Sequence, residues 1–344
     1  MPLTKKDRIN TVYGGGRHVV ILGAGASIAS SIRNPEISGK ELPSMNNFIE
    51  ILQLEDILES VPKNLQAKNF EIFYSNLYNH NNHSKEIKEI EKRVHAYFKY
   101  MELPDKATIY DHLVLSLRPN DLIASFNWDP FLFQAYTRNR KVADLPDLAF
   151  LHGNVAIGYN KEDDRAAFAG MTHKITGRYY APTKLLYPVT MKNYNDDDFI
   201  KGEWKKVKVY LKSQHTCLVT IFGYGAPETD IEAKTLLNKA WGTSKKRSME
   251  QFEIIDIRTE DEVRDVWDNF IHSHHYDYST NYFDSSLANN PRRTRENYHQ
   301  HIYFLSEDEA FSESNPIPND IHSLKDLWEW HRPLIEVERR HKST

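Results

Sequence analysis

An asparagine and a histidine, each standing where an apolar run ends, are the side chains best suited to chemistry in this chain. Asn127 follows the run Leu122–Phe126, and His152 follows Leu148–Leu151. Side chains at the carboxyl end of a parallel strand face the ligand crevice of an open α/β sheet, so both would lie where a substrate binds. A histidine there can act as a general base near neutral pH, and Gly153 beside it leaves room for a ligand. Taken alone, each residue is more often structural than catalytic.

A glycine-rich turn closes another apolar run near the N-terminus. Val19–Ser27 has the sequence VVILGAGAS, a β-branched strand that gives way to Gly23, Gly25 and the hydroxyl of Ser27. Glycines there let the backbone approach a pyrophosphate at the start of the next helix, where free N–H groups and the helix dipole favour anions. The pattern is GxGxS rather than GxGxxG, so an ordinary strand-to-helix turn is an equally good interpretation of this motif alone. Ser27 would contact phosphate, cap the helix, or do both.

Two later runs repeat the pattern of a buried strand followed by a polar turn. Cys217–Leu237 contains an apolar strand, a glycine-rich turn and an acidic helix start, with Thr229 or Asp230 as the expected N-cap. Phe252–Ile257 is a buried strand that ends near Asp256.

Together these motifs resemble the sirtuin superfamily, and more closely its bacterial sirtuin-like NAD-hydrolase branch used in anti-phage defence. The resemblance spans about residues 17 to 260 and rests on GAGAS, LPSMNNF (Leu42–Phe48), SFNWD, LHGN and FGYGAPETDIEA. It implies that Asn127 and His152 are the catalytic pair and that the GAG loop holds the NAD pyrophosphate.

The resemblance also implies what each group would do. Cleavage of the bond between nicotinamide and ribose passes through an oxocarbenium-like transition state, so the site must orient the ribose, stabilise positive charge and admit a water. Asn127 would hold a ribose hydroxyl and the water, and His152 would accept a proton from a ribose hydroxyl. Asp129 either contacts ribose or caps the next helix, and Asp256 either binds the adenosine ribose or closes a turn. The expected NAD-binding residues are Gly23, Ala24, Gly25, Ser27, Asp129, Gly223, Tyr224 and Asp256.

Cysteine usage separates the branches of that superfamily. Sirtuin deacylases hold a structural zinc with two CxxC pairs, whereas this chain has one cysteine, Cys217, which we interpret as a buried, inert thiol. The resemblance then favours a glycohydrolase with NAD as substrate and no metal. The alternative is a module that binds NAD or an ADP-ribose-like nucleotide without turnover; a deacylase or an ADP-ribosyltransferase is less favoured.

Composition excludes several other classes. The chain has 344 residues, of which 40% are hydrophobic and 27% charged, as expected for a soluble globular protein with ample core. A net charge of −4 gives no field that would attract nucleic acid or an anionic membrane. No apolar run approaches the ~18 residues of a membrane span and the N-terminal segment has no apolar signal region, so we expect a cytoplasmic protein.

The alternation of apolar runs and helical periods predicts a doubly wound, Rossmann-like parallel sheet. Its strands are expected near 18–23, 121–126, 148–151, 216–222 and 252–257. Helices are expected over 45–61, 64–79, 84–101 and 107–117, forming an insert (about 45–117) over the nucleotide crevice, and again over 196–213, 229–241, 260–271 and 321–341. The turn-rich stretch 158–189 is typical of a lid or binding loop. We expect a catalytic domain over 17–271 and a C-terminal extension over 272–344 that docks on the body or forms an oligomer.

The segment 272–301 has an unusual composition. It holds His272, His274, His275, His299 and His301 together with Arg292, Arg293 and Arg295. A metal site is one interpretation, but the spacing matches no zinc pattern, and an exposed connection or oligomer contact is favoured. Because the chain carries no recognisable sensor domain, the resemblance to defence enzymes implies activation by a partner subunit or nucleotide ligand within a homo- or hetero-oligomer.

Overall fold

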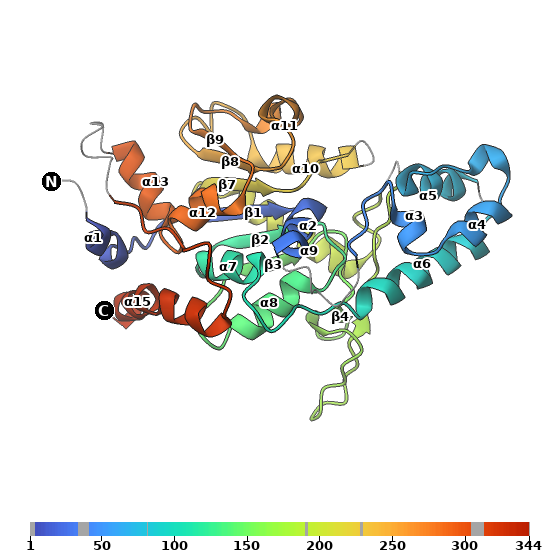
Figure 1. Cartoon of the computed structure of the whole chain (residues 1–344), viewed down its shortest axis with the longest axis horizontal. Coiled ribbons are helices and arrows are strands. Elements are labelled where there is room, and N and C mark those ends of the chain that lie inside the picture. The colour runs from blue at the N-terminus through green and yellow to red at the C-terminus, as the bar shows by residue number, and fades with distance from the viewer. Residues whose placement is uncertain are drawn as a thin grey trace.

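The computed structural model describes residues 4–33, 41–80, 82–189, 192–227, 230–303 and 313–343. At its centre lies a six-stranded sheet in the order β3-β2-β1-β7-β8-β9, in which every neighbouring pair is parallel (Figure 1). The strands are β1 (Arg17–Leu22), β2 (Leu122–Ser125), β3 (Asp147–Phe150), β7 (Thr216–Phe222), β8 (Gln251–Ile255) and β9 (Tyr276–Ser279). The first five lie where strands are predicted from the sequence. The predicted Rossmann-like α/β fold is therefore confirmed.

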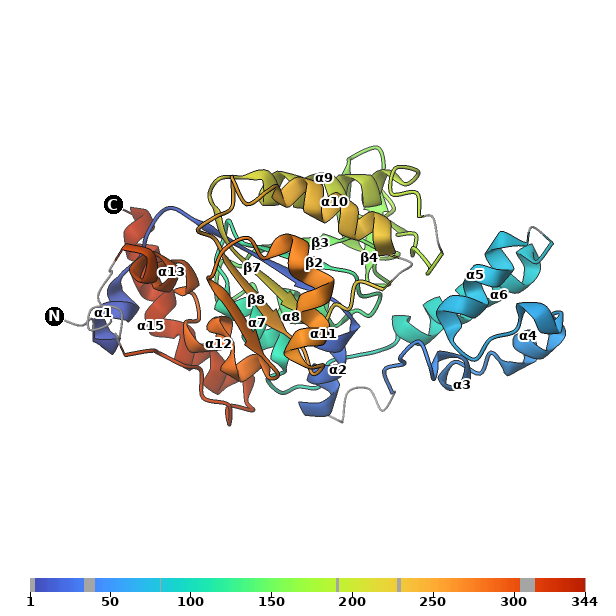
Figure 2. The same ribbon diagram turned by 90° about the horizontal axis from the view of Figure 1, so that it is seen from above.

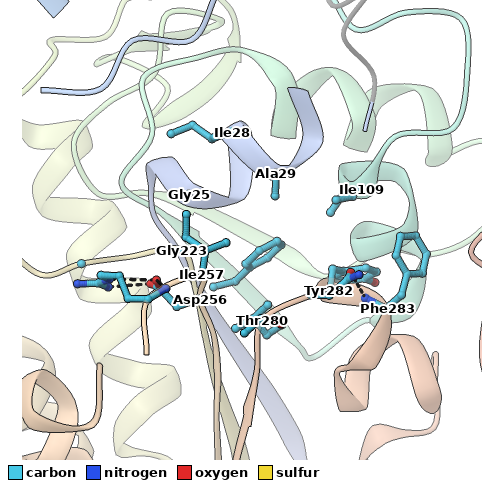
Figure 3. Close-up of a pocket in the computed structure, with 15 residues that line it drawn as sticks. Gly25, Ile28, Ala29, Ile109, Gly223, Asp256, Ile257, Thr280, Tyr282 and Phe283 are labelled. Carbon is cyan, nitrogen blue, oxygen red and sulfur yellow. Dashed lines mark hydrogen bonds and ion pairs between the residues drawn. The ribbon is translucent and has the colours of Figure 1, made fainter. Parts of the chain in front are cut away.

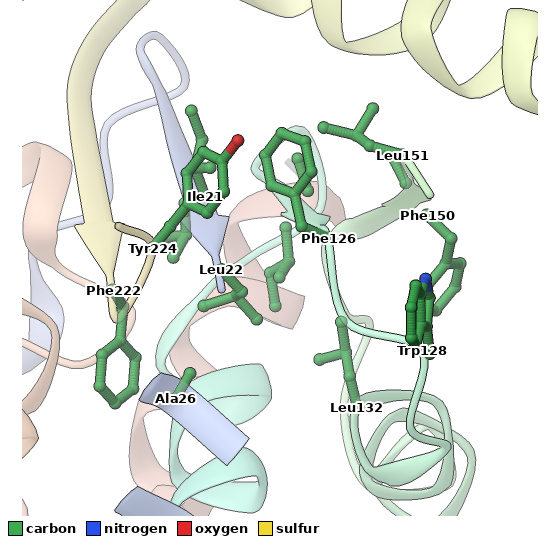
Figure 4. Packing of buried hydrophobic residues seen from close by; sticks show 14 of the residues in the cluster. Ile21, Leu22, Ala26, Phe126, Trp128, Leu132, Phe150, Leu151, Phe222 and Tyr224 are labelled. Carbon is green, nitrogen blue, oxygen red and sulfur yellow. The ribbon is translucent and has the colours of Figure 1, made fainter. Parts of the chain in front are cut away.

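The central strands are apolar because both faces of the sheet are covered. Val19, Val20, Ile21 and Leu22 of β1 are fully buried, and every residue of β7 is buried. Figure 4 shows Ile21, Leu22 and Phe222 of these strands packed beside Ala26 of the following helix. Cys217 is buried in β7, as predicted, and burial raises the pKa of its thiol to about 12.

Two groups of helices cover the sheet. The helices are α1 (Lys5–Asn10), α2 (Ala24–Arg33), α7 (Ile109–Ser116), α8 (Phe131–Asn139), α9 (Asp198–Lys212), α10 (Ile231–Trp241), α11 (Glu260–Trp267), α12 (Ser286–Asn289), α13 (Thr294–Tyr303) and α15 (Leu324–Ser343), with 3-10 turns η3 (Asp268–Phe270) and η4 (Tyr282–Asp284). Helix α9 packs against α10 on one side, whereas α7 packs against α2, α8 and α12 on the other (Figure 2). Helix α7 therefore belongs to the body of the molecule, although the sequence places its residues in the helical insert.

The other helices of the predicted insert form an arm at one end of the molecule (Figures 1 and 2). They are α3 (Phe48–Ile51), α4 (Glu55–Ser60), η1 (Lys63–Leu65), α5 (Phe70–Asn79) and α6 (Ser84–Lys99). The single helix expected over 45–61 is wrong, because the chain breaks at Gln53, which has a φ of +54°. Gln53 donates its N–H to Glu50 O and Leu54 donates to Ile49 O, at 3.0 and 2.8 Å, which is the Schellman pattern that ends a helix. Glycine usually occupies that left-handed position, so the sequence gives no signal for this break.

The excursion 158–189 contains a small antiparallel sheet in the order β5-β4-β6. Its strands are β4 (Ile157–Asn160), β5 (Arg165–Phe168) and β6 (Ala181–Pro182). After β6 the chain returns to the body, where Leu185 and Leu186 are buried against the main core.

The arginines of segment 272–301 are buried, whereas the sequence predicts an exposed segment. Arg292 and Arg293 both donate to the carboxylate of Glu338 on α15, at 2.6 Å for the shortest contact of each. Arg292 also donates to Leu117 O at 2.8 Å. Because a guanidinium has five donors in a fixed plane, it can be buried when carboxylate and carbonyl oxygens satisfy them. These bonds dock α15 on the body, and the domain boundary at residue 271 stays a prediction.

No cluster of three or more histidine, cysteine, aspartate or glutamate side chains within the described residues could hold a metal ion. None of the helices that the described residues form combines the length and apolar character that a bilayer span requires.

Candidate functional site

Two cavities meet at the carboxyl ends of β1 and β7. One has a volume of about 320 Å³ and the other about 690 Å³. Ile28, Gly223 and Gly225 line both of them. The strand order β3-β2-β1-β7-β8-β9 changes direction between β1 and β7, and ligands of open α/β sheets bind in the crevice at such a switch point. Both volumes lie within the range of small-molecule sites.

Every residue that the sequence assigns to the site lines one of these two cavities. The smaller cavity, which we call the reaction cavity, is lined by Gly23, Ala24, Ser27, Asn127, Asp129, His152, Gly223 and Tyr224. The larger, which we call the adenosine-side cavity, is lined by Gly25, Gly223 and Asp256. The roles assigned to these residues stay predictions, but the structure brings the residues together.

The two glycine turns pack directly against each other. The N–H of Gly25 donates to Gly223 O at 2.9 Å. This N–H is therefore not free for a phosphate, contrary to the expectation from the sequence. A Cβ on Gly25 would lie 2.7 Å from Gly223 Cα, and Gly223 itself has a φ of +61°. Gly25 is thus required by the close approach of the β7 turn, rather than by its own φ.

Asn127 is tied to the glycine turn and to helix α7. Its Nδ2 lies 2.8 Å from Gly23 O, 3.0 Å from Ser27 Oγ and 3.2 Å from Tyr110 Oη. Among the described residues nothing donates to Asn127 Oδ1, so the amide oxygen is the group left for a ligand. Tyr110 was not predicted, because its position on a helix far from the glycine motif gives no signal in the sequence.

Asp129 lies one residue before Pro130, the N-cap residue of α8, and bonds to the start of that helix; its contact with ribose stays a prediction. Its Oδ1 accepts from the Phe131 N–H at the start of α8 at 3.2 Å, and its Oδ2 accepts from Ser27 Oγ at 2.7 Å. Ser27 also contacts Tyr110 Oη at 2.5 Å and is 2% exposed, so its hydroxyl is held inside the protein. Burial raises the pKa of Asp129 to about 6.

His152 is buried and neutral at physiological pH. Burial lowers its pKa to about 4, and Lys192 lowers it further, whereas the nearby carboxylate of Asp230 opposes this shift. Its Nε2 lies 3.3 Å from Tyr194 Oη and 3.8 Å from Asp230 Oδ1. The expectation that Gly153 leaves room for a ligand is wrong. A Cβ at Gly153 would lie 2.0 Å from Lys184 O, so this glycine makes room for the loop after β6.

A buried ion pair stands beside His152 in the reaction cavity. Lys192 contacts the Asp230 carboxylate, whose other oxygen accepts from Tyr224 Oη at 3.0 Å. Asp230 is the N-cap residue of α10, as predicted, but its side chain makes no capping hydrogen bond. The alternative cap, Thr229, lies outside the described residues. Lys192 was missed because it lies in a loop, where a lysine is usually solvated.

Aromatic rings form the wall behind His152. Phe126 stacks on Tyr224 with 4.0 Å between ring centroids and meets the His152 ring edge to face at 4.8 Å. The His152 ring also lies parallel to the Tyr194 ring at 5.9 Å. Figure 4 shows Phe126 and Tyr224 side by side above the strand ends. These rings exclude water from the imidazole, which is the physical cause of its low pKa.

The adenosine-side cavity is mostly apolar and holds one pair of charges. Figure 3 shows Ile28, Ile109 and Phe283 around it, with Asp256 at its rim. Asp256 accepts from Arg258 Nε at 3.0 Å and from its Nη2 at 2.7 Å, and also from the Arg258 N–H at 3.0 Å. The last bond closes a turn, one of the two predicted roles of Asp256. Ile257 is 84% exposed at this rim.

No protein-family model matches the chain, and no curated protein sequence matches it. A Sir2 homologue in complex with NAD aligns with a TM-score of 0.42 at 10% identity, covering 87% of this chain and 97% of that chain. A Sir2 homologue variant in complex with 2′-O-acetyl ADP ribose gives 0.43 at 11% identity, covering 85% and 97%. Sir2 bound to an acetylated peptide gives 0.36 at 12%, covering 85% and 94%.

Proposed function

We propose that this chain is an NAD glycohydrolase, which cleaves NAD to nicotinamide and ADP-ribose. One observation carries the proposal. Asn127 and His152 line one cavity, and Gly223 and Gly225 of the β7 turn line both this cavity and a second one, which Asp256 also lines. A dinucleotide has two nucleoside halves joined by a pyrophosphate, and such a ligand fits two adjoining cavities at a switch point.

The groups of the reaction cavity suit this reaction. Nicotinamide departs from the ribose as a neutral molecule, so the site must stabilise the positive charge left on the sugar. Asn127 Oδ1 supplies an amide oxygen whose partial negative charge can face the sugar and orient a ribose hydroxyl and the water, whereas the Asp230 carboxylate is paired with Lys192. His152, neutral above about pH 4, can accept a proton from a ribose hydroxyl. The water then adds to the sugar carbon, where one of its protons stays on the new hydroxyl and the other leaves to solvent. His152 returns its proton to the ribose hydroxyl.

We further propose that activity is triggered, as in an effector of bacterial anti-phage defence. The sequence resemblance supports the biological setting. The state of the site supports the need for a trigger, because Asn127 Nδ2 and His152 Nε2 already have protein partners. An activating subunit or nucleotide that binds the rearranged state preferentially would increase its population.

The same observation favours one second candidate, a module that binds NAD without turnover. If Tyr194 stays on His152 Nε2 when NAD binds, the imidazole cannot accept the ribose proton. The two candidates predict different results in one assay.

The assay measures nicotinamide release by the purified full-length chain, alone and with the products of its neighbouring genes. We expect release only with the activator, and none from Asn127→Ala or His152→Ala. His80→Ala is the matched control, since His80 is exposed at the end of α5 and lies in neither cavity. NAD binding without nicotinamide release under every condition would favour the binding module, and rapid turnover by the chain alone would contradict the trigger.

A further inference from the structure

The carboxylate at the end of β8 is paired with a guanidinium. Asp256 is 8% exposed and accepts from Arg258 through two parallel bonds, Nε to Oδ1 at 3.0 Å and Nη2 to Oδ2 at 2.7 Å (Figure 3). Such bidentate pairs are the strongest and most directional of side-chain ion pairs. Asp256 in turn raises the pKa of Arg258, which stays charged.

This pairing changes which nucleotides the cavity can accept. In related α/β sheets an unpaired carboxylate near this place binds both hydroxyls of the adenosine ribose and repels a 2′-phosphate, whereas a nearby arginine accommodates that phosphate. Here the two groups occur together, and the guanidinium neutralises the carboxylate. A 2′-phosphate would therefore meet no uncompensated negative charge at the rim.

Arg258 has donors left for such a phosphate. A guanidinium has five N–H groups, and Asp256 accepts from two of them. The side chain of Arg258 is 36% exposed and lines the adenosine-side cavity. It is the one cation, and Asp256 the one anion, among the described residues that line this cavity.

The surroundings fix where the guanidinium points. Its Nη1 lies 3.5 Å from the position of a Cβ on Gly225, a residue that lines both cavities. Tyr278 Oη donates to Arg258 O, which holds the backbone of this turn against β9. Glu262 on α11 adds a further negative charge nearby, which helps to keep the guanidinium charged. Arg258 is thus held between the expected ribose site and the turn that joins the cavities.

We propose that the adenosine-side cavity accepts a 2′-phosphoadenosine as well as an adenosine, with Arg258 as the residue that determines this specificity. The chain would then bind 2′-phosphorylated dinucleotides alongside NAD. The inference rests on the proposed function, because it assumes that this cavity takes the adenosine half of a dinucleotide.

The test is calorimetric binding of ADP-ribose and of 2′-phospho-ADP-ribose to the full-length chain, which needs no turnover. We expect the two affinities to lie within about 5-fold of each other. Arg258→Ala should weaken 2′-phospho-ADP-ribose by about 10- to 100-fold, the usual range for loss of a charged hydrogen bond, and ADP-ribose by less than about 3-fold. Arg258→Lys keeps the charge without the fork, so it should restore part of the loss.

Arg264→Ala is the matched control, because Arg264 lies on α11 over the Tyr276 ring and outside the cavity. Thermal melting of each variant verifies folding, and Arg258→Lys supplies the answer if the alanine variant is unfolded. Binding of ADP-ribose with rejection of its 2′-phosphate by more than about 100-fold would overturn the inference alone. Equal losses of both ligands in Arg258→Ala would also overturn it, since Arg258 would then serve the pyrophosphate. Failure of both ligands to bind would overturn the nucleotide site and the inference together.

Discussion

Replacing Asn127 with alanine should remove both chemistry and stability, and the structure gives the size of the second effect. Asn127 is 8% exposed, and its Nδ2 lies within hydrogen-bond distance of three oxygens, the nearest being Gly23 O at 2.8 Å. Two N–H groups are lost on truncation, and the Gly23 carbonyl stays buried without its side-chain donor. A lost hydrogen bond of this kind costs about 1 to 1.5 kcal/mol, so we expect about 2 to 3 kcal/mol for Asn127→Ala.

That cost converts to a small shift in Tm. Unfolding entropy is about 2.1 cal/mol/K per residue, or about 0.7 kcal/mol/K for 344 residues, so Tm should fall by about 3 to 4 °C. The protein stays folded at 25 °C, and nicotinamide release by the activated protein should fall by at least about 100-fold. Differential scanning fluorimetry and chromatographic detection of nicotinamide on the same preparation measure the two effects.

Tyr110→Phe is the control that separates them. It removes the hydroxyl that contacts Asn127 at 3.2 Å and Ser27 at 2.5 Å, but Tyr110 does not line the reaction cavity. We expect a loss of about 1 to 2 kcal/mol, with activity kept within about 10-fold. If Tyr110→Phe loses as much activity as Asn127→Ala, the effect belongs to the buried network and the catalytic assignment of Asn127 fails.

Three further predictions follow from the charged groups. His152 has a pKa lowered to about 4 by burial, so the acid limb of kcat/KM should lie near pH 4, and a limb near pH 6.5 would contradict its role as a buried base. Burial raises the pKa of Asp129 from 3.8 in the unfolded chain to about 6, so its contribution to the free energy of unfolding is complete below pH 3.8 and is lost as the pH rises through 6. Urea unfolding should therefore show a loss of up to about 3 kcal/mol in the free energy of unfolding between pH 4 and 8, and Asp129→Asn should remove this loss. Asp230→Ala removes the buried carboxylate that Lys192 contacts and should cost about 3 to 5 kcal/mol. Lys192→Met should restore most of this loss in a double-mutant cycle, and additive losses would show that the two groups are not coupled.

Five strands of the sheet could be predicted because a parallel strand covered on both faces is a continuous apolar run. β9 could not be predicted. Tyr276–Ser279 is an edge strand in which tyrosines alternate with polar residues, and none of its four residues is buried. The burial of Arg292 was also unpredictable, because it depends on Glu338 and on carbonyl groups far away in the chain. Composition describes the average environment of a residue type, and these residues are exceptions created by tertiary packing.

The residues of the candidate site also fall into a group that the sequence predicts and a group that it does not. Asn127 and His152 could be placed together because the carboxyl ends of parallel strands share one edge of a sheet. Tyr110 and Tyr194 could not, since one lies on a helix and the other in a loop, and their contacts depend on how those elements pack. The same holds for Arg258, whose pairing with Asp256 needs a turn that the apolar pattern of β8 does not specify.

The unpredicted tyrosines bear directly on how such a site would be switched. Tyr110 and Tyr194 contact Asn127 Nδ2 and His152 Nε2 from outside the reaction cavity. If substrate engagement breaks these contacts at a cost of about 2 kcal/mol, the competent state is about 30-fold less populated than the resting state. An activator with about 30-fold preference for the competent state would make the two equally populated, and a ligand without such preference would change nothing. Because neither tyrosine lines the cavity, an activating partner that displaces α7 and the loop before α9 would break both tyrosine contacts without touching the substrate.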